Sequence, residues 1–418
     1  MPRPPLDAAA WVALAVALAL PACDSATSVP DHRDLHRDEA ELRRGDAQLA
    51  AGDAEGAIEL YRRGLQAARA EGADPDARDR LGVYADRIGA ALAASGDYDG
   101  ALEAYERSLA LAEEASRRDP EDLHFRQELA RAHHNLAVAH EDLEQLDAAA
   151  ASERRAVALH QALLRDQPGQ TKWAESLTLN YATLGEIELA REDDTEAVAA
   201  YQRRLEVAED RASLRPANPE WSRELVIART DLGEALRLAD DAPAALAVLE
   251  PGLALADQRL ADDPDSSIAL IDRFDLGHEL GSALRDLHRL DEAERAFRTD
   301  LELLQADPSS RREDLAQAHY DLADVLYERG ENTAAAAAFR ARLEVLEGDP
   351  DADPDELAEE LASTWTNIGM ALEGAEDPAG ALAAYRAAQA AQAALDTEST
   401  EDRRGFLERA IARLAPED

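Results

Sequence analysis

Cysteine and aromatic residues are scarce in this sequence. Cys23 is the single cysteine among 418 residues, so neither an intrachain disulfide nor a multi-thiolate metal site is expected. Phe, Trp and Tyr together make up only 4% of the chain. A core with so little aromatic bulk must be built mainly from Ala and Leu, and Ala favours helices over strands. The composition therefore predicts an all-α fold.

Positive charge is also in short supply. The chain has 44 Lys and Arg against 88 Asp and Glu, which gives a formal net charge of −44. Such a charge repels phosphate backbones and excludes a general nucleic-acid binder. Although 32% of the residues are charged, 46% are hydrophobic, and that share is enough to bury a core.

The N-terminus carries an apolar run, Ala8 to Leu20, that is too short to span a bilayer as a helix. It suits the hydrophobic region of a secretory signal peptide that ends in the small residue Ala22. Cys23 follows at once, and this order resembles the lipobox of bacterial lipoproteins, in which the thiol is acylated. Pro21 departs from that pattern, and an ordinary signal peptide with a nearby cysteine is the alternative. Residues 24 to 37 are polar and are expected to form a tether.

The rest of the chain repeats itself. Pro120, Pro168, Pro216 and Pro264 recur every 48 residues, which indicates one supersecondary unit used again and again. A small residue recurs in eight copies, at Gly45, Gly89, Ala137, Gly185, Gly233, Gly281, Ala323 and Gly369. Twelve places later comes an alanine in every copy, at Ala57, Ala101, Ala149, Ala197, Ala245, Ala293, Ala335 and Ala381. Small residues of this kind let two antiparallel helices cross closely.

A bulky residue follows four places after the alanine in seven of the copies, at Tyr61, Tyr105, Tyr201, Leu249, Phe297, Phe339 and Tyr385. The third copy has Glu153 instead. This pattern resembles the tetratricopeptide repeat, with copies 42 to 48 residues apart where the common repeat has 34. The resemblance implies an all-α, right-handed superhelical solenoid of about eight antiparallel helix pairs over residues 38–395. The surplus length predicts longer helices, and residues 396–418 are expected to hold a capping helix and tail.

The resemblance also implies a concave groove lined by the first helix of each pair. Acidic residues fall at one equivalent groove position in four copies, namely Asp46, Glu186, Glu234 and Asp324. The neighbouring groove positions supply His134, His278, Leu189, Tyr320 and Tyr327. A groove wall of one sign attracts opposite charge, so a basic protein segment is the expected partner. The Lys and Asn clamp of chaperone-binding members is absent from these positions, and Lys172 is the only lysine.

Two features could instead hold a metal. His133, His134 and His140 lie close together in the third copy, where buried, hydrogen-bonded histidines are the alternative. Asp349, Asp351, Asp353 and Glu360 have the spacing of an EF-hand loop, but Pro354 occupies the place where glycine is needed. The alternative for this loop is an acidic cap on the following helix.

The sequence therefore predicts a non-enzymatic protein-interaction scaffold or assembly factor without cofactors, lipid-anchored at the bacterial cell envelope. The domain organisation expected is a signal peptide at 1–22, a lipidated Cys23 and tether at 23–37, the repeats at 38–395 and the cap at 396–418. The alternatives are a metal-dependent sensor or enzyme that uses the histidines or the Asp349 loop, and a cytoplasmic regulatory array.

Overall fold

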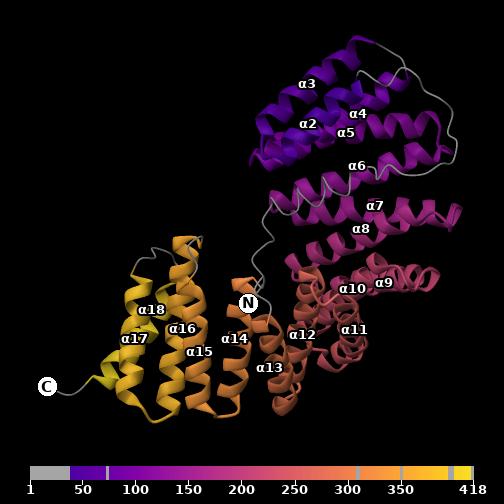
Figure 1. Cartoon of the computed structure of the whole chain (residues 1–418). Helices are drawn as coiled ribbons and strands as arrows, with labels where there is room; N and C mark the ends of the chain where they lie inside the picture. The colour runs from indigo at the N-terminus through magenta and orange to yellow at the C-terminus, as the bar shows by residue number, and fades with distance from the viewer. Residues whose placement is uncertain (1–37, 72–74, 307–310, 349–351, 394–399, 416–418) are drawn as a thin grey trace. The chain divides into compact units, whose positions relative to one another are not determined.

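The computed structural model describes residues 38–71, 75–306, 311–348, 352–393 and 400–415. These residues form helices α2 to α18 and no strand, which confirms the predicted all-α fold (Figure 1). The predicted signal peptide, Cys23 and the tether lie outside the described residues. Within the described part of the chain, no helix combines the length and the apolar character needed to cross a membrane.

The helices pair as the repeat predicts, with each copy contributing a first and a second helix. The first helices are α2 (Asp38–Ala50), α4 (Pro75–Ala94), α6 (Leu123–Asp142), α8 (Thr171–Ala190), α10 (Pro219–Leu238), α12 (Ser267–Asp286), α14 (Arg312–Glu328) and α16 (Pro354–Gly374). The second helices are α3 (Ala54–Ala70), α5 (Tyr98–Arg118), α7 (Leu146–Asp166), α9 (Asp194–Leu214), α11 (Ala242–Asp262), α13 (Leu290–Ala306), α15 (Asn332–Glu347) and α17 (Pro378–Gln392). Helices of 20 and 21 residues in the second to fifth copies account for the long period.

The eight aligned alanines sit where the helices of each pair cross. All eight are fully buried, with a relative exposure of 0%. The small residue of the first helix lies against the bulky residue of the second: a Cβ added at Gly45 would stand 2.4 Å from the ring of Tyr61, and one at Gly281 would stand 2.3 Å from Phe297. The register read from the sequence is therefore the packing register of the helices.

The turn between the two helices of a pair has the same backbone in every copy. The residue seven places after the small residue has a positive φ in all eight, at Gly52, Gly96, Glu144, Glu192, Asp240, His288, Gly330 and Glu376. The following residue often caps the second helix: the Asp53 carboxylate accepts from the Gly56 amide at 2.9 Å, and Asp97 accepts from Gly100 at 3.0 Å.

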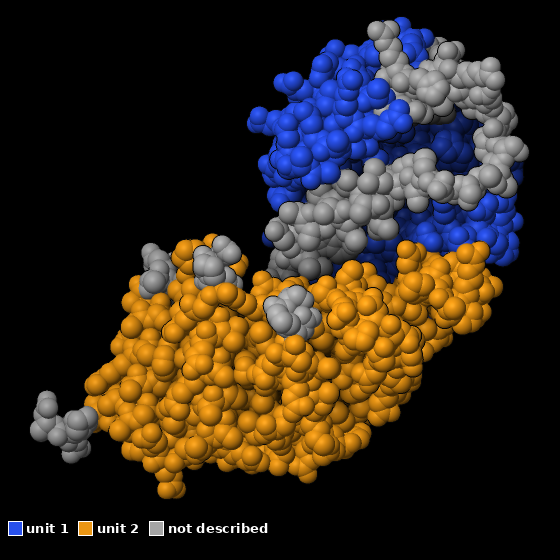
Figure 2. Space-filling view, in the orientation of Figure 1, with its two compact units in different colours: residues 1–207 blue, residues 208–418 orange. Residues whose placement is uncertain are grey.

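The chain divides into two compact units, residues 1–207 and 208–418, with the boundary inside α9 (Figure 2). In unit 1 each helix from α2 to α8 packs on the next, and in unit 2 the same holds from α10 to α17. Helix α18 (Thr400–Leu414) packs on α17, where it buries Leu407 and sets Phe406 edge-on to Tyr385 at 5.7 Å between ring centroids. It covers the apolar surface that the last pair would otherwise expose.

Candidate functional site

The predicted groove residues all lie on first helices, and we call their set the first-helix row. Unit 1 holds Asp46, His134, Glu186 and Leu189, and unit 2 holds Glu234, His278, Tyr320, Asp324 and Tyr327. Every member is half-buried except Tyr327, which is 38% exposed. Since each unit is a separate body, the row is described within each unit.

In unit 1, Asp46 is engaged by the next copy. Its carboxylate lies 2.9 Å from Nε of Arg87 on α4 and accepts a hydrogen bond of 2.7 Å from the Tyr61 hydroxyl. Burial, and then the hydrogen bond to Asp46, raise the pKa of Tyr61 well above its usual range. The acid at this position therefore ties α2 to α3 and α4.

Ion pairs link first helices in unit 2 in the same way. Arg285 on α12 pairs with Asp324 on α14, and His278 Nδ1 lies 2.7 Å from Asp321 Oδ2 across the same two helices. Burial raises the pKa of the Asp324 carboxyl, while Arg285 acts in the opposite direction. Asp46 and Asp324 thus both face arginines, so opposite charges lie side by side at these two places of the row.

Tyr320 forms an aromatic platform in the row. Its ring meets Phe339 edge-on at 5.9 Å, and the Arg342 guanidinium carbon lies 5.0 Å from its centroid. Arg342 is held by a 2.7 Å hydrogen bond to Thr364 Oγ1 and an ion pair of 3.3 Å with Glu360. The platform combines an apolar face with a buried cation.

The three histidines of the third copy do not converge on one point. His134 faces Glu153 at 3.1 Å, His140 faces Gln145 at 2.8 Å, and His133 is buried, which lowers its pKa. Among the described residues there is no group of three or more His, Cys, Asp or Glu side chains placed to hold a metal ion.

The acidic loop before α16 is described only in part, because Asp349 and Asp351 lie outside the described residues. Asp353 caps α16 and accepts from the amides of Asp355 at 2.9 Å and Glu356 at 3.2 Å. Glu360 forms an ion pair with Arg342. Asp353 therefore caps the start of α16, as the capping alternative predicted, and Glu360 forms an ion pair.

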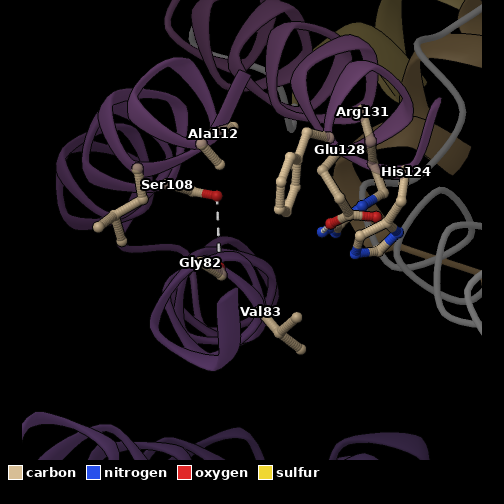
Figure 3. Close-up of a pocket in the computed structure, with 10 residues that line it drawn as sticks. Gly82, Val83, Ser108, Ala112, His124, Glu128 and Arg131 are labelled. Carbon is tan, nitrogen blue, oxygen red and sulfur yellow. Dashed lines mark hydrogen bonds and ion pairs between the residues drawn. The ribbon is translucent and has the colours of Figure 1, made fainter. Parts of the chain in front are cut away.

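A small cavity, which the sequence did not predict, lies between α4, α5 and α6 (Figure 3). It has a volume of about 50 Å³, with Gly82 and Val83 on one side and the ion-paired Glu128 and Arg131 on the other. Ser108 donates a 3.3 Å hydrogen bond to the Gly82 carbonyl. Ligand pockets usually measure about 300–1,000 Å³, so this space suits at most a small group.

A signal for the cavity was present in the repeat register. Seven places before the small residue, the fifth and sixth copies carry Val226 and Phe274, whereas the second copy carries Gly82. A Cβ added at Gly82 would meet nothing within 4 Å. The absence of a side chain at Gly82 leaves open space on the α4 side of the cavity.

Comparison with known proteins shows which repeat and which solved folds this geometry resembles. The model of the tetratricopeptide repeat matches residues 83–121. RapI in its apo form is a structural match with a TM-score of 0.54 and 11% identity, over 85% of this chain and 97% of that one, a likeness that shows the fold alone. No curated protein matches the sequence.

Two further solved structures resemble smaller parts or resemble the chain less closely. BtubC from P. vanneervenii has a TM-score of 0.47 and 19% identity over 60% of this chain and 91% of that one. The quorum sensor NprR from B. thuringiensis, in its apo form, has a TM-score of 0.47 and 11% identity over 85% and 87%. The family model matches one copy, and the eight-fold register of buried alanines extends the same helix pair along the described residues, so the chain has a tetratricopeptide-like repeat fold with long repeats.

Proposed function

We propose that the chain is a protein-interaction scaffold held at the bacterial cell envelope, and that a basic protein segment binds along the first-helix row. The observation that carries the proposal is the row itself. Half-buried acids recur on it at one register position, with Tyr320, Tyr327 and Leu189 beside them. Within each unit, stacked repeats present such residues along one face, which can serve as a binding surface.

Charge selects the class of partner. With a net charge of −44 the molecule attracts basic segments over a distance, and a desolvated acidic surface strengthens that attraction locally. Asp46 and Asp324 are occupied by arginines, so a partner meets guanidinium groups beside carboxylates at these two places. A segment with alternating basic and apolar side chains matches this pattern better than a uniformly basic one.

The binding test uses a synthetic helical peptide of alternating Lys and Leu faces, titrated into the full chain by calorimetry. Binding should weaken as added salt shortens the Debye length from about 30 to about 3 Å. Glu186→Arg and Glu234→Arg should each weaken it further. Glu106→Arg and Glu250→Arg are the matched controls, since both residues are exposed at the same register position of second helices.

Glu206 and Glu209 are poorer controls, because each forms an ion pair, with Arg203 at 2.6 Å and with Arg229 at 2.8 Å. Equal losses of affinity in the row variants and in the matched controls would show that the partner does not bind at the first helices. Binding that is insensitive to salt would remove the electrostatic argument.

The envelope tether rests on Cys23 and the apolar run before it. Wild type and Cys23→Ser are expressed in a bacterial host with labelled palmitate and fractionated. Label and membrane association should be present in the wild type and lost in the variant, because acyl chains supply the anchor. Equal fractionation of the two forms, or unlabelled soluble wild type, would favour an ordinary secreted or a cytoplasmic array.

A further inference from the structure

The third copy departs from the repeat at one buried place. Where the other copies have Tyr, Phe or Leu, it has Glu153, and the side chain of Glu153 is fully buried at 0% exposure. Burying a carboxylate among packed helices is costly unless it is paired and hydrogen-bonded. Its neighbours should therefore explain how the carboxylate is held.

Three side chains from three helices meet around Glu153. His134 on α6 has Nδ1 at 3.1 Å from Oε2, and Asn180 on α8 donates its amide to Oε1 at 2.7 Å. The Asn180 oxygen in turn lies 2.6 Å from Nδ1 of His160 on α7. We call these four residues the buried network.

The hydrogen bonds fix where protons must lie. Because the Asn180 amide nitrogen donates to Glu153, its oxygen is the acceptor toward His160, and His160 Nδ1 must carry a proton. An ionised Glu153 can only accept, so His134 Nδ1 must also carry a proton. The network is therefore complete with a proton on Nδ1 of both His134 and His160.

The two histidines are shifted in opposite directions. Burial lowers the pKa of His134, but the charge and the hydrogen bond of Glu153 outweigh it, so the pKa of His134 is raised overall. Burial lowers the pKa of His160, and this outweighs its hydrogen bond to Asn180. The buried carboxylate thus favours the protonated form of His134, whereas burial favours the neutral form of His160.

Other charged groups face the network from its own helices. On α6, Glu141 adds to the raised pKa of His134 and Arg131 opposes it. For His133, on the same helix, Arg155 on α7 adds to the lowered pKa, while Glu113 on α5 and then Glu153 act in the opposite direction.

The adjoining helices have their own ion pairs. Asp86 on α4 pairs with Arg131. Glu188 on α8 is fully buried and pairs with Arg154 on α7 at 2.6 Å and with Arg191 at 2.5 Å. Glu153 is accordingly held by His134 and Asn180, while the other buried acids of this region have arginines.

We propose that the buried network is a proton-operated switch that couples pH to the packing of α6, α7 and α8. His134 also belongs to the first-helix row, with 16% of its side chain exposed, so the switch reaches the proposed binding surface. When His134 releases its proton to solvent, Glu153 becomes a buried charge without a cation, and the three helices loosen. This effect on partner binding rests on the proposed function, whereas the effect on packing does not.

The signs define a window of pH. The His134 contribution is complete below the ordinary histidine pKa and is lost as pH rises through its raised value. The His160 contribution is complete above the ordinary histidine pKa and is lost as pH falls through its lowered value. The network is therefore tightest near neutral pH and loosens on both sides.

The test follows the full chain by hydrogen exchange of α6 to α8 and by NMR of ring-labelled histidines, from about pH 5 to about pH 9. The protection factor of these helices, which is corrected for the intrinsic pH dependence of amide exchange, should fall by up to about tenfold per pH unit between the ordinary histidine pKa and the His134 midpoint, and should level off above that midpoint. Glu153→Leu, which restores the residue type of Leu249, should remove this alkaline loss of protection and lower the His134 midpoint. His140→Gln, on the same helix but outside the network, is the control.

If Glu153→Leu does not fold, Glu153→Gln retains the size and the bond to Asn180 while removing the charge, and it should lower the His134 midpoint likewise. An unchanged His134 midpoint in the folded variant, or the same alkaline loss of protection in wild type and variant, would overturn the proposal. Both readouts need no partner, so their failure is distinct from a failure of peptide binding. A peptide affinity that follows the His134 midpoint would extend the switch to the binding surface.

Discussion

The ring of Tyr201 on α9 lies against the backbone of Gly185 on α8, so that a Cβ added at Gly185 would stand 2.4 Å from Tyr201 Cζ. Tyr201 is 3% exposed and has little room to move. Gly185→Ala gains about 1 kcal/mol of helix propensity but overpacks the crossing at a cost of about 1–3 kcal/mol. We expect a net loss of stability in urea unfolding. The seventh copy has Ala323 opposite Phe339, so alanine is accepted at this register position in another copy. The cost of Gly185→Ala therefore arises because the Tyr201 ring is already fixed in place.

Gly82→Ala is the matched control for that substitution. It gains the same propensity in the middle of α4, and its Cβ meets nothing within 4 Å beside the cavity of Figure 3. This variant should be more stable than the wild type by about 0.5–1 kcal/mol. Urea midpoints that shift in the same direction for both variants would contradict the packing register.

The sequence allowed the repeat architecture to be predicted because small and bulky residues recur at fixed spacing. Ala57 and Tyr61 carry that information locally, and close packing gives them only one way to fit. The contacts between copies could not be predicted in this way. Arg87 meets Asp46 because of the rotation of α4 against α2, which no spacing encodes, and Asn180 reaches Glu153 from a different repeat.

Gly96 adopts a φ of +82° at the turn between α4 and α5. A residue with a Cβ is sterically strained in this conformation, so Gly96→Ala should destabilise the protein by about 1 kcal/mol. Gly96→Asn should cost less, because Asn tolerates the left-handed region. Glu192 occupies the equivalent turn at φ 59°, and Glu192→Gly should relieve strain there without a comparable loss. Thermal unfolding of the three variants measures the order, and an Ala variant as stable as the wild type would refute it.

Burial, followed by the charges of Asp142 and Glu153, raises the pKa of Glu141 to about 7, while His134 acts in the opposite direction. A carboxyl with a raised pKa contributes stability that is complete at low pH and is lost as pH rises through about 7. Glu141→Gln should therefore stabilise the protein by about 1–3 kcal/mol at about pH 8 and have little effect at about pH 4. Glu106→Gln, an exposed acid, should show no such difference. Urea unfolding at both values of pH decides the matter, and parallel pH profiles for Glu141→Gln and wild type would exclude the shift.

The ion pair between Arg237 on α10 and Glu279 on α12 joins two first helices in unit 2. Nε of Arg237 lies 3.1 Å from Glu279 Oε2, and the Glu279 side chain is only 3% exposed. Arg237→Leu leaves a buried carboxylate without its guanidinium, which should cost about 3 kcal/mol. The double variant with Glu279→Leu should regain most of that loss, because no buried charge is left behind.

The control for this ion pair is Arg107, whose partner Glu103 is 74% exposed on α5 at 2.9 Å. Exposed pairs contribute about 0–1 kcal/mol, so Arg107→Leu should be nearly neutral in the same urea titration. A loss for Arg237→Leu no greater than that for Arg107→Leu would mean that water reaches Glu279 in solution. In that case the ion pairs between first helices would contribute little to stability. A basic partner could then displace Arg237 from Glu279 at a small cost in free energy. If the predicted difference is found, a basic partner must instead recognise the carboxylates of the row together with the arginines that pair with them.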